Sequence, residues 1–246
     1  MARRVTVVNF CSAALDMLDF STAMLTENAG GPADYVLMTW NATPEVSEWA
    51  RRKGIYTKTY DTDPSIGYVP NLRAMFNAGY DAGFALNDYV VLVNTDMAFG
   101  HCWLSSLTRR ATPEIIPCCV HITPIDLPWG VKADLGIPGR TFRYRDFWTL
   151  HDRLHTLGRS EREAERGGWQ NTASFPFCLH RSWWEKCGPW ELEYRGDLPP
   201  DRRFLERCHK AGAEFIMCHD SIVYHHEAVE RRGPRPTGLE NIPESA

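Results

Sequence analysis

The first hundred residues alternate between short β-branched or apolar runs and segments with helical hydrophobic spacing. The runs lie at 4–9, 35–39, 55–60 and 89–93, and apolar residues recur every three or four positions between them. Strands that alternate with helices build parallel βαβ units. The run 89–93 (Tyr-Val-Val-Leu-Val) is apolar throughout, which is typical of a central parallel strand covered on both faces. We therefore expect an α/β fold with a Rossmann-like, mainly parallel twisted sheet and flanking helices.

Composition sets wide limits on what this chain does. It has 246 residues, 43% of them hydrophobic and 24% charged, as in ordinary globular proteins. With 27 Lys and Arg against 31 Asp and Glu, the net charge is −4, which argues against a protein that coats nucleic acid. The eight cysteines show no zinc-ligand spacing, and most lie in apolar runs. We expect reduced thiols and a cytoplasmic protein. No signal peptide and no integral membrane segment is expected.

The second half of the chain is less regular. We expect that it completes the same sheet, with strands at 115–122, 174–179, 215–218 and 221–224, and helices at 147–157, 181–186 and 201–211. The charged segment 158–168 is expected to be a mobile loop. Residues 229–246 are rich in Pro, Gly and charge, and we expect a flexible tail there.

Ligands of doubly wound sheets bind at the carboxyl ends of the strands. Segments 9–11, 40–43, 61–63 and 94–96 follow expected strands and are largely polar or aromatic, without a glycine-rich phosphate loop. Asp96 ends the apolar run, where a carboxylate is costly unless it faces a site or a cation. Such an oxygen suits a divalent ion that bridges phosphates, although Asp is also a common turn residue.

Six short motifs follow one another along the chain. They are Val7-Val8-Asn9-Phe10, Asn77-Ala78-Gly79-Tyr80, 91–96 (Val-Leu-Val-Asn-Thr-Asp), 177–190, 201–212 and Ile222-Val223-Tyr224-His225. Their order and spacing resemble those of family 2 glycosyltransferases with the GT-A fold. Asn94-Thr95-Asp96 resembles the D-x-D motif in the N-x-D form of rhamnosyltransferase-like members. The resemblance implies one GT-A domain over 1–228, with a nucleotide-sugar half to about 111 and an acceptor half over about 112–228.

The resemblance also implies a metal-dependent, inverting transfer of sugar from a nucleotide-diphosphate sugar to an acceptor hydroxyl. Asp96 would bind the divalent metal, Mn²⁺ or Mg²⁺, and His225 would be the late metal ligand. His226 competes for that role, because successive side chains of a strand point in opposite directions. An ordinary strand-end histidine is the alternative interpretation of His225.

Asp201 occupies the position of the general base in the family's E-D motif, which takes the proton from the acceptor hydroxyl. Pro200 replaces the preceding Glu, so Asp197 is a rival for the base. Asp201 would also suit a helix N-cap after two prolines.

The donor pocket departs from the family pattern, because Trp40 stands where an acid usually contacts the base. Recognition would then use stacking on Trp40 and hydrogen bonds from Asn41, with Asp61 and Asp63 as further contacts. Arg73 could reach the diphosphate, or be an exposed helix arginine. The full set of donor candidates is Asn9, Phe10, Trp40, Asn41, Asp61, Asp63, Arg73, Asn77, Asn94 and Thr95.

Trp129, Trp169 and Gln170 flank the charged loop and are the acceptor candidates, because aromatic faces stack on sugar rings. Each Trp could equally be a packing residue. The acceptor could be a glycan, a protein or a modified nucleic-acid base. Positive charge is concentrated near this side of the molecule at Arg140, Arg143, Arg145, Arg153 and Arg159.

Two other classes of protein fit part of the pattern. A nucleotidyltransferase would carry a glycine-rich basic loop after the first strand, and 10–14 (Phe-Cys-Ser-Ala-Ala) is neither glycine-rich nor basic. A non-catalytic nucleotide- or sugar-binding protein that kept the fold would explain the altered E-D motif and the missing base-site acid.

Overall fold

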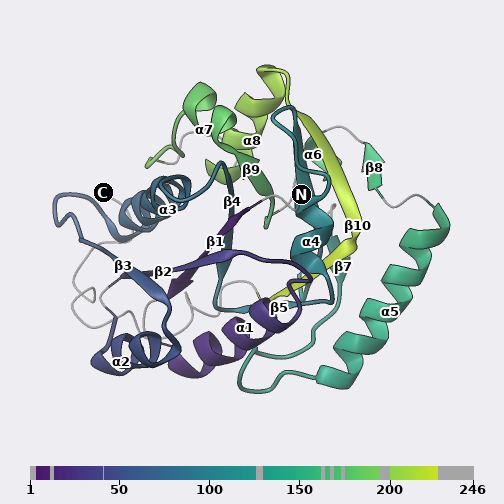
Figure 1. Cartoon of the computed structure of the whole chain (residues 1–246), viewed down its shortest axis with the longest axis horizontal. Coiled ribbons are helices and arrows are strands. Elements are labelled where there is room, and N and C mark those ends of the chain that lie inside the picture. Colours follow the sequence, from purple (N-terminus) through teal and green to yellow (C-terminus); the bar gives the residue numbers. More distant parts are fainter. Residues whose placement is uncertain are drawn as a thin grey trace.

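The computed structural model of the chain describes residues 4–11, 14–40, 42–125, 130–161, 164–166, 169–172, 175–193 and 200–226 (Figure 1). In these ranges the strands form two sheets. The first has the order β3-β2-β1-β4-β9. Its strands are β1 (Thr6–Cys11), β2 (Asp34–Trp40), β3 (Tyr56–Tyr60), β4 (Tyr89–Asn94) and β9 (Cys178–His180). The first four are mutually parallel, and β9 runs antiparallel to β4.

Helices cover both faces of this first sheet. The helices of the first half are α1 (Leu15–Glu27), α2 (Pro44–Lys53) and α3 (Tyr68–Phe84). Val7 of β1 packs in a core with residues of α1, whereas Val8 and Phe10 pack on the opposite face with residues of α3. Residues of α2 pack with α1 residues and with Leu37 of β2. The expected parallel sheet between two helical layers is confirmed.

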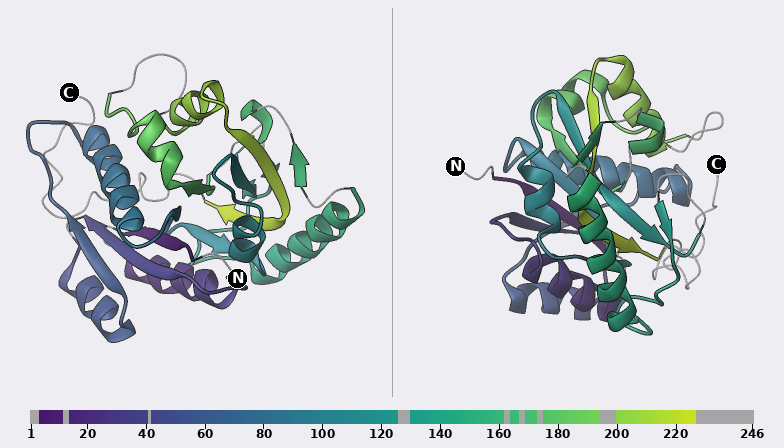
Figure 2. Two further views of the ribbon diagram at one scale, coloured as in Figure 1. Left: turned by 45° about the horizontal axis from the view of Figure 1, so that its top comes forward. Right: turned by 90° about the vertical axis from the view of Figure 1, so that its right-hand side faces the viewer.

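The second sheet has the order β5-β10-β6-β7, and β8 pairs with β10. Its strands are β5 (Met97–Phe99), β6 (Ile115–Thr123), β7 (Gly130–Lys132), β8 (Ala164–Arg166) and β10 (Glu214–His225). The remaining helices are α4 (Trp103–Thr108), α5 (Tyr144–Glu161), α6 (Trp169–Thr172), α7 (Arg181–Cys187) and α8 (Pro200–Lys210). Figure 2 shows α5 at one side of the molecule, away from α2 and α3.

The second half differs from the sequence expectation in three respects. Only β9 joins the first sheet, because the chain turns after β4 and its next strand, β5, pairs with β10 instead. The two strands expected over 215–224 are one strand, β10, whose register against β6 shifts between Cys218 and Ile222. Part of the expected loop 158–168 is ordered, since α5 continues to Glu161 and β8 follows. Arg and Glu are good helix formers, so the charge of this segment does not oppose a helix.

The expectation of a flexible tail concerns residues 229–246, which lie outside the described residues. A helix with the length and apolar character needed to cross a bilayer does not occur in the described ranges.

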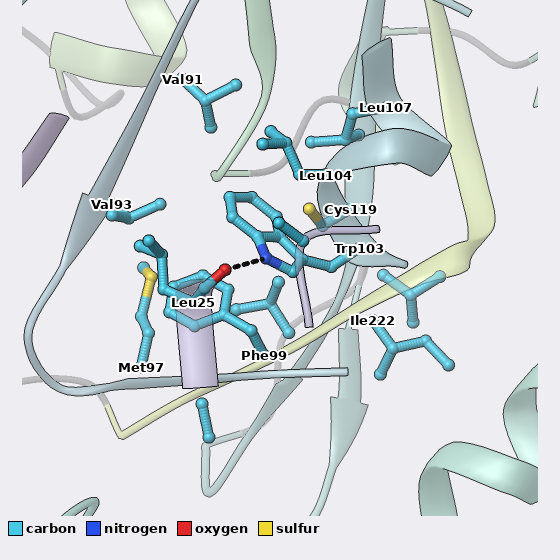
Figure 3. Close-up of a cluster of buried hydrophobic side chains, with 14 of the residues drawn as sticks. Leu25, Val91, Val93, Met97, Phe99, Trp103, Leu104, Leu107, Cys119 and Ile222 are labelled. Carbon is cyan, nitrogen blue, oxygen red and sulfur yellow. Dashed lines mark hydrogen bonds between the residues drawn. The ribbon is translucent and has the colours of Figure 1, made fainter. Parts of the chain in front are cut away.

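Trp103 packs in the layer of buried apolar side chains between the two sheets (Figure 3). Its side chain is completely buried among Val91, Phe99 and Leu104. Its Nε1 donates a hydrogen bond of 3.1 Å to the carbonyl oxygen of Leu25. That carbonyl belongs to the last turn of α1, where helix carbonyls lack intrahelical donors. Trp103 therefore ties α4 to the carboxyl end of α1.

Gly79 allows α3 to approach β1 closely. A Cβ atom at this position would lie 2.6 Å from Cζ and 2.9 Å from Cε1 of the Phe10 ring. Phe10 is itself buried, with its ring edge-on to Phe76. The glycine of the Asn77-Ala78-Gly79-Tyr80 motif is therefore explained by packing of the helix on the sheet.

We expect Gly79→Ala to destabilise the protein by about 1–3 kcal/mol, because the buried Phe10 ring would have to shift. Urea denaturation followed by circular dichroism measures this change. Gly31→Ala is the matched control, since a Cβ there would meet only an ordinary contact of 3.7 Å. Equal stability of the two variants would contradict the packing role.

His151 is buried at the interface between α5 and the second sheet. Its Nδ1 lies 3.1 Å from Oδ1 of Asp152, and its Nε2 has no hydrogen-bond partner among the described residues. The rings of His101 and His155 lie 5.7 Å from the His151 ring. Burial lowers the pKa of His151, and the Asp152 carboxylate offsets this only in part.

This histidine predicts that the protein loses stability in mild acid. The pKa in the folded state is below the ordinary value of about 6.5, so the unfolded chain binds more protons below that pH. The free energy of unfolding therefore falls as the pH drops from about 6.5 towards the folded-state pKa. Urea denaturation at pH 7.5 and pH 5.5 measures the loss, and His151→Gln should reduce it. If the free energy of unfolding of His151→Gln falls with pH as much as that of the unsubstituted protein, His151 does not cause the loss of stability in acid.

Candidate functional site

Asp96 and His225 meet where the two sheets join. Asp96 follows β4 in the turn that leads into β5, and His225 is the last residue of β10. Because β10 pairs with β5 in the register His225 to Met97, these residues are neighbours. Oδ1 of Asp96 lies 3.0 Å from Nε2 of His225, and Asp96 is only 3% exposed. The sequence singled out both residues, and the fold brings them together.

The contact has the spacing of two ligands of one metal ion. Two ligands at right angles, each about 2.1 Å from an octahedral ion, are about 3 Å apart. Oδ1 of Asp96 is buried and accepts no hydrogen bond from the described residues. Among those residues, no third His, Cys, Asp or Glu completes a group that could hold an ion. The Asp96 carboxylate thus fits a divalent ion that takes its other ligands from phosphate oxygens and water, with the His225 imidazole as a nitrogen ligand.

His226 lies beside this contact without sharing its geometry. Its backbone N–H donates a 3.1 Å hydrogen bond to the carbonyl oxygen of Asp96. Its ring lies 6.3 Å from the ring of Tyr224. The side chain that the structure places at the Asp96 carboxylate is that of His225.

The sequence analysis missed His121, a residue of β6. Its ring stacks on His225 with a centroid separation of 5.3 Å and an interplanar angle of 20°. Burial, and to a smaller extent electrostatic repulsion by the neighbouring His225, lowers the pKa of His121 to about 3, so this imidazole is neutral. The sequence feature that could have pointed to His121 is its place as a polar, titratable residue within the apolar run 115–123.

The strand ends of β1 and β4 lie side by side, with Phe10 opposite Asn94. Asn9 is buried, and its Oδ1 has no hydrogen-bond partner among the described residues. Phe10 and Thr95 are also buried. The structure thus places these four donor candidates at one edge of the sheet, with Phe10 used in the core.

Trp40 is a packing residue in this structure. It is 1% exposed and stacks on Tyr68 at 5.0 Å. Its Nε1 donates a 2.7 Å hydrogen bond to Oγ1 of Thr62. Because one face and the N–H group of the indole are used inside the protein, stacking of a base on Trp40 has no support here. Asn41 lies outside the described residues.

Asp61 and Asp63 belong to the loop between β3 and α3. Asp61 is exposed, and Asp63 accepts hydrogen bonds from the backbone N–H and the hydroxyl of Ser65. The loop is held by Asn71, which is buried in α3. Its Oδ1 accepts from the Tyr60 hydroxyl and the Asp63 N–H, and its Nδ2 donates to backbone carbonyls of the loop.

Arg73 and Asn77 of α3 contact protein rather than open space. Arg73 donates to the carbonyl oxygen of Leu192. Asn77 forms two hydrogen bonds with the backbone of Trp190, accepting from its N–H at 2.9 Å and donating to its carbonyl at 3.0 Å. The amide group expected to face the donor is therefore bonded to segment 188–193.

Asp201 lies in the first turn of α8 and is partly exposed. The next residue, Arg202, is buried, stacks on Trp169 at 4.9 Å and donates to the carbonyl oxygen of Gln170. Trp169 is thus a buried residue that ties α6 to α8, whereas the side chain of Gln170 is exposed. The other base and acceptor candidates, Asp197 and Trp129, lie outside the described residues.

The arginines that the sequence analysis expected near the acceptor are partly neutralised. Arg140 pairs with Asp16, and Arg143 lies within 4 Å of both Asp134 and Asp146. Arg145 and Arg153 are exposed on α5. The side chain of Arg159 is outside the described part of the structure.

The structure is an α/β fold with a buried carboxylate–histidine contact beyond the carboxyl edge of its mainly parallel sheet, which is the edge where ligands of such sheets bind. No family model and no curated protein matches the sequence. Solved structures do match. The crystal structure of GalNAc-T7 with UDP, GalNAc and Mn²⁺ gives a TM-score of 0.61 at 12% identity, over 92% of this chain and 44% of that chain. S. aureus TarS 1–349 gives a TM-score of 0.57 at 12% identity, over 92% of this chain and 61% of that chain.

Both of these proteins are similar to this chain in fold, and the chain spans less than two thirds of each. The likeness shows that the chain has a GT-A glycosyltransferase fold, as the sequence motifs predicted. At this level of identity it shows the fold alone.

We expect Asp96→Asn to keep the fold and to lose the stabilisation by Mn²⁺ with a nucleoside diphosphate. The amide has the shape of the carboxylate but lacks its charge, so about 1.5–3 kcal/mol of binding free energy would be lost. Thermal unfolding with Mn²⁺ and UDP, GDP, dTDP or CDP measures this, because a bound ligand raises the melting temperature. His225→Ala should behave alike, and His226→Ala is the control that keeps the rise. If Mn²⁺ and the nucleotide raise the melting temperature of Asp96→Asn as much as that of the unsubstituted protein, Asp96 is not a metal ligand.

Proposed function

We propose that this protein is a metal-dependent, inverting glycosyltransferase. It would move a sugar from a nucleotide-diphosphate sugar to an acceptor hydroxyl. The GT-A fold supports this at the level of class, and one observation carries it for this chain. That observation is the buried contact between Asp96 and His225 at the carboxyl edge of the sheet, with the spacing of two metal ligands.

Asp96 and His225 would hold a divalent ion, Mn²⁺ or Mg²⁺. Such an ion stabilises the negative charge that develops on a leaving diphosphate. GalNAc-T7 was crystallised with UDP and Mn²⁺, which supports the same pairing of nucleotide and metal here. Asn9, Asn94, Thr95 and Asp61 would then contact the donor.

The acceptor hydroxyl must lose a proton as its oxygen attacks the anomeric carbon on the face opposite the diphosphate. Asp201 is our candidate for the base that receives this proton. It lies in the first turn of α8, where the partial positive charge of the helix N-terminus favours the ionised carboxylate that a base needs. Asp197 is the rival candidate.

The finer assignments rest on the sequence. Asn94-Thr95-Asp96 supports a rhamnosyltransferase-like member of family 2. Residues to about 111 would form the nucleotide-sugar half and about 112–228 the acceptor half, with Gln170 and Trp129 nearest the acceptor. The cytoplasmic location stays a proposal from the sequence, which places most of the cysteines in apolar runs.

The function is tested by incubating the protein with Mn²⁺ and a panel of nucleotide-sugars and measuring release of nucleoside diphosphate. Turnover of one donor, with an inverted anomeric configuration of the product by NMR, is the expected result. Nucleotide binding without turnover of any donor or acceptor would favour the non-catalytic alternative.

We expect Asp201→Asn to lower kcat by about 10²–10⁴, since removing a general base costs that much. Nucleotide binding should be unchanged, because this residue does not contact the donor diphosphate in the proposal. Asp197→Asn is assayed in parallel. If this variant loses kcat and Asp201→Asn keeps it, Asp197 is the base. Full activity in both variants would exclude a base at either position.

A further inference from the structure

Segment 188–193 is bound on one side by α3. Asn77 makes both of its hydrogen bonds with the backbone of Trp190, and Arg73 donates to Leu192. The Trp190 indole packs 5.3 Å from the ring of Phe76 and 6.0 Å from that of Tyr80. The segment therefore cannot move without breaking contacts to this helix.

The same segment is bound on its other side by α8. Glu191 accepts hydrogen bonds from both Arg203 and Arg207. Arg207 also donates to the carbonyl oxygen of Cys187 at 3.0 Å and to that of Pro189 at 2.7 Å. One guanidinium thus binds three points of the chain, which fixes the orientation of α8 against the segment.

Asp201 belongs to the helix that this network holds. The Tyr80 ring of α3 lies 6.5 Å from the ring of Phe204, which follows Asp201 by three residues in α8. Tyr80 follows Asn77 by one turn of α3, so α3 is close to the amino end of α8. The contacts of Asn77 and Arg207 therefore hold segment 188–193 against both α3 and α8, the helix whose first turn carries Asp201.

We propose that Asn77 and Arg207 are positioning residues for Asp201: they lock segment 188–193 between α3 and α8 and so fix the first turn of α8. This inference rests on the proposed function, in which Asp201 is the base. It replaces the expectation that Asn77 contacts the donor, because its amide oxygen and nitrogen each bond to Trp190 instead.

The proposal predicts that loss of the Asn77 amide lowers the rate of catalysis without weakening donor binding. Without the Asn77 amide, the segment and the first turn of α8 can shift, and a misplacement of about 1 Å costs up to about 100-fold in rate. We expect Asn77→Ala to lower kcat by about 10- to 100-fold, with the Kd of the nucleoside diphosphate and the KM of the donor unchanged.

The experiment measures kcat, donor KM, nucleotide Kd by calorimetry and melting temperature for Asn77→Ala. Asn87→Ala is the matched control, because Asn87 also makes two side-chain hydrogen bonds, to Thr6 and Asp34, but lies beyond the carboxyl end of α3, in the turn before β4. Both variants should lose similar stability, and only Asn77→Ala should lose kcat. Arg207→Lys, which keeps the charge but not the fork of donors, should repeat the effect if Asn77→Ala fails to fold.

Two outcomes overturn the proposal. A raised nucleotide Kd in Asn77→Ala would make Asn77 a donor contact. An unchanged kcat in both Asn77→Ala and Arg207→Lys would leave the network a purely structural role. Asp201→Asn separates these failures from failure of the function itself: if that variant keeps full activity, the base is wrongly assigned, whatever the result at Asn77.

Discussion

The contact between the Asp96 carboxylate and the His225 imidazole is the constraint around which the two sheets are arranged. A buried carboxylate is costly without a cation or a donor, yet Asp96 is nearly inaccessible to water. The chain turns after β4 so that β5 pairs with β10, the last strand of the described residues, and this pairing brings Nε2 of His225 to 3.0 Å from the carboxylate. Trp103 and its neighbours then fill the space behind this junction.

This arrangement explains why the site lies at a junction rather than in the centre of one sheet. The first sheet supplies Asn9, Asn94 and Asp96 at its carboxyl edge, and the second supplies His225 and His121. The candidate metal site therefore forms only when both sheets are folded and in contact.

The sequence predicted the first half of the fold closely because its information is local. In residues 4–96 each strand or helix is indicated by its own few residues, through apolar runs, helical spacing and polar residues at the strand ends. The pairing of β5 with β10 and the single long strand β10 could not be predicted in this way. They depend on which distant segments meet, and the register shift between Cys218 and Ile222 hides the continuity of β10. His121 was missed for the same reason, since only strand pairing brings it to His225.

The candidate site was predicted least well where one residue type serves two purposes. Trp40 and Asn77 were assigned to the donor because indoles stack and amides bond to ligands. The structure uses the same properties inside the protein, with Tyr68 and Thr62 for Trp40 and the Trp190 backbone for Asn77. For Asp96 the sequence left two interpretations open, a metal ligand and a turn residue, and the structure places its carboxylate 3.0 Å from the His225 imidazole.

The most direct test of the metal site is anomalous diffraction from crystals grown with Mn²⁺ and a nucleoside diphosphate. A functional Asp96–His225 pair predicts one anomalous peak about 2.1–2.2 Å from both Oδ1 of Asp96 and Nε2 of His225, with phosphate oxygens among the other ligands. A bound nucleotide with its Mn²⁺ at another place, or with no metal at this pair, would contradict it.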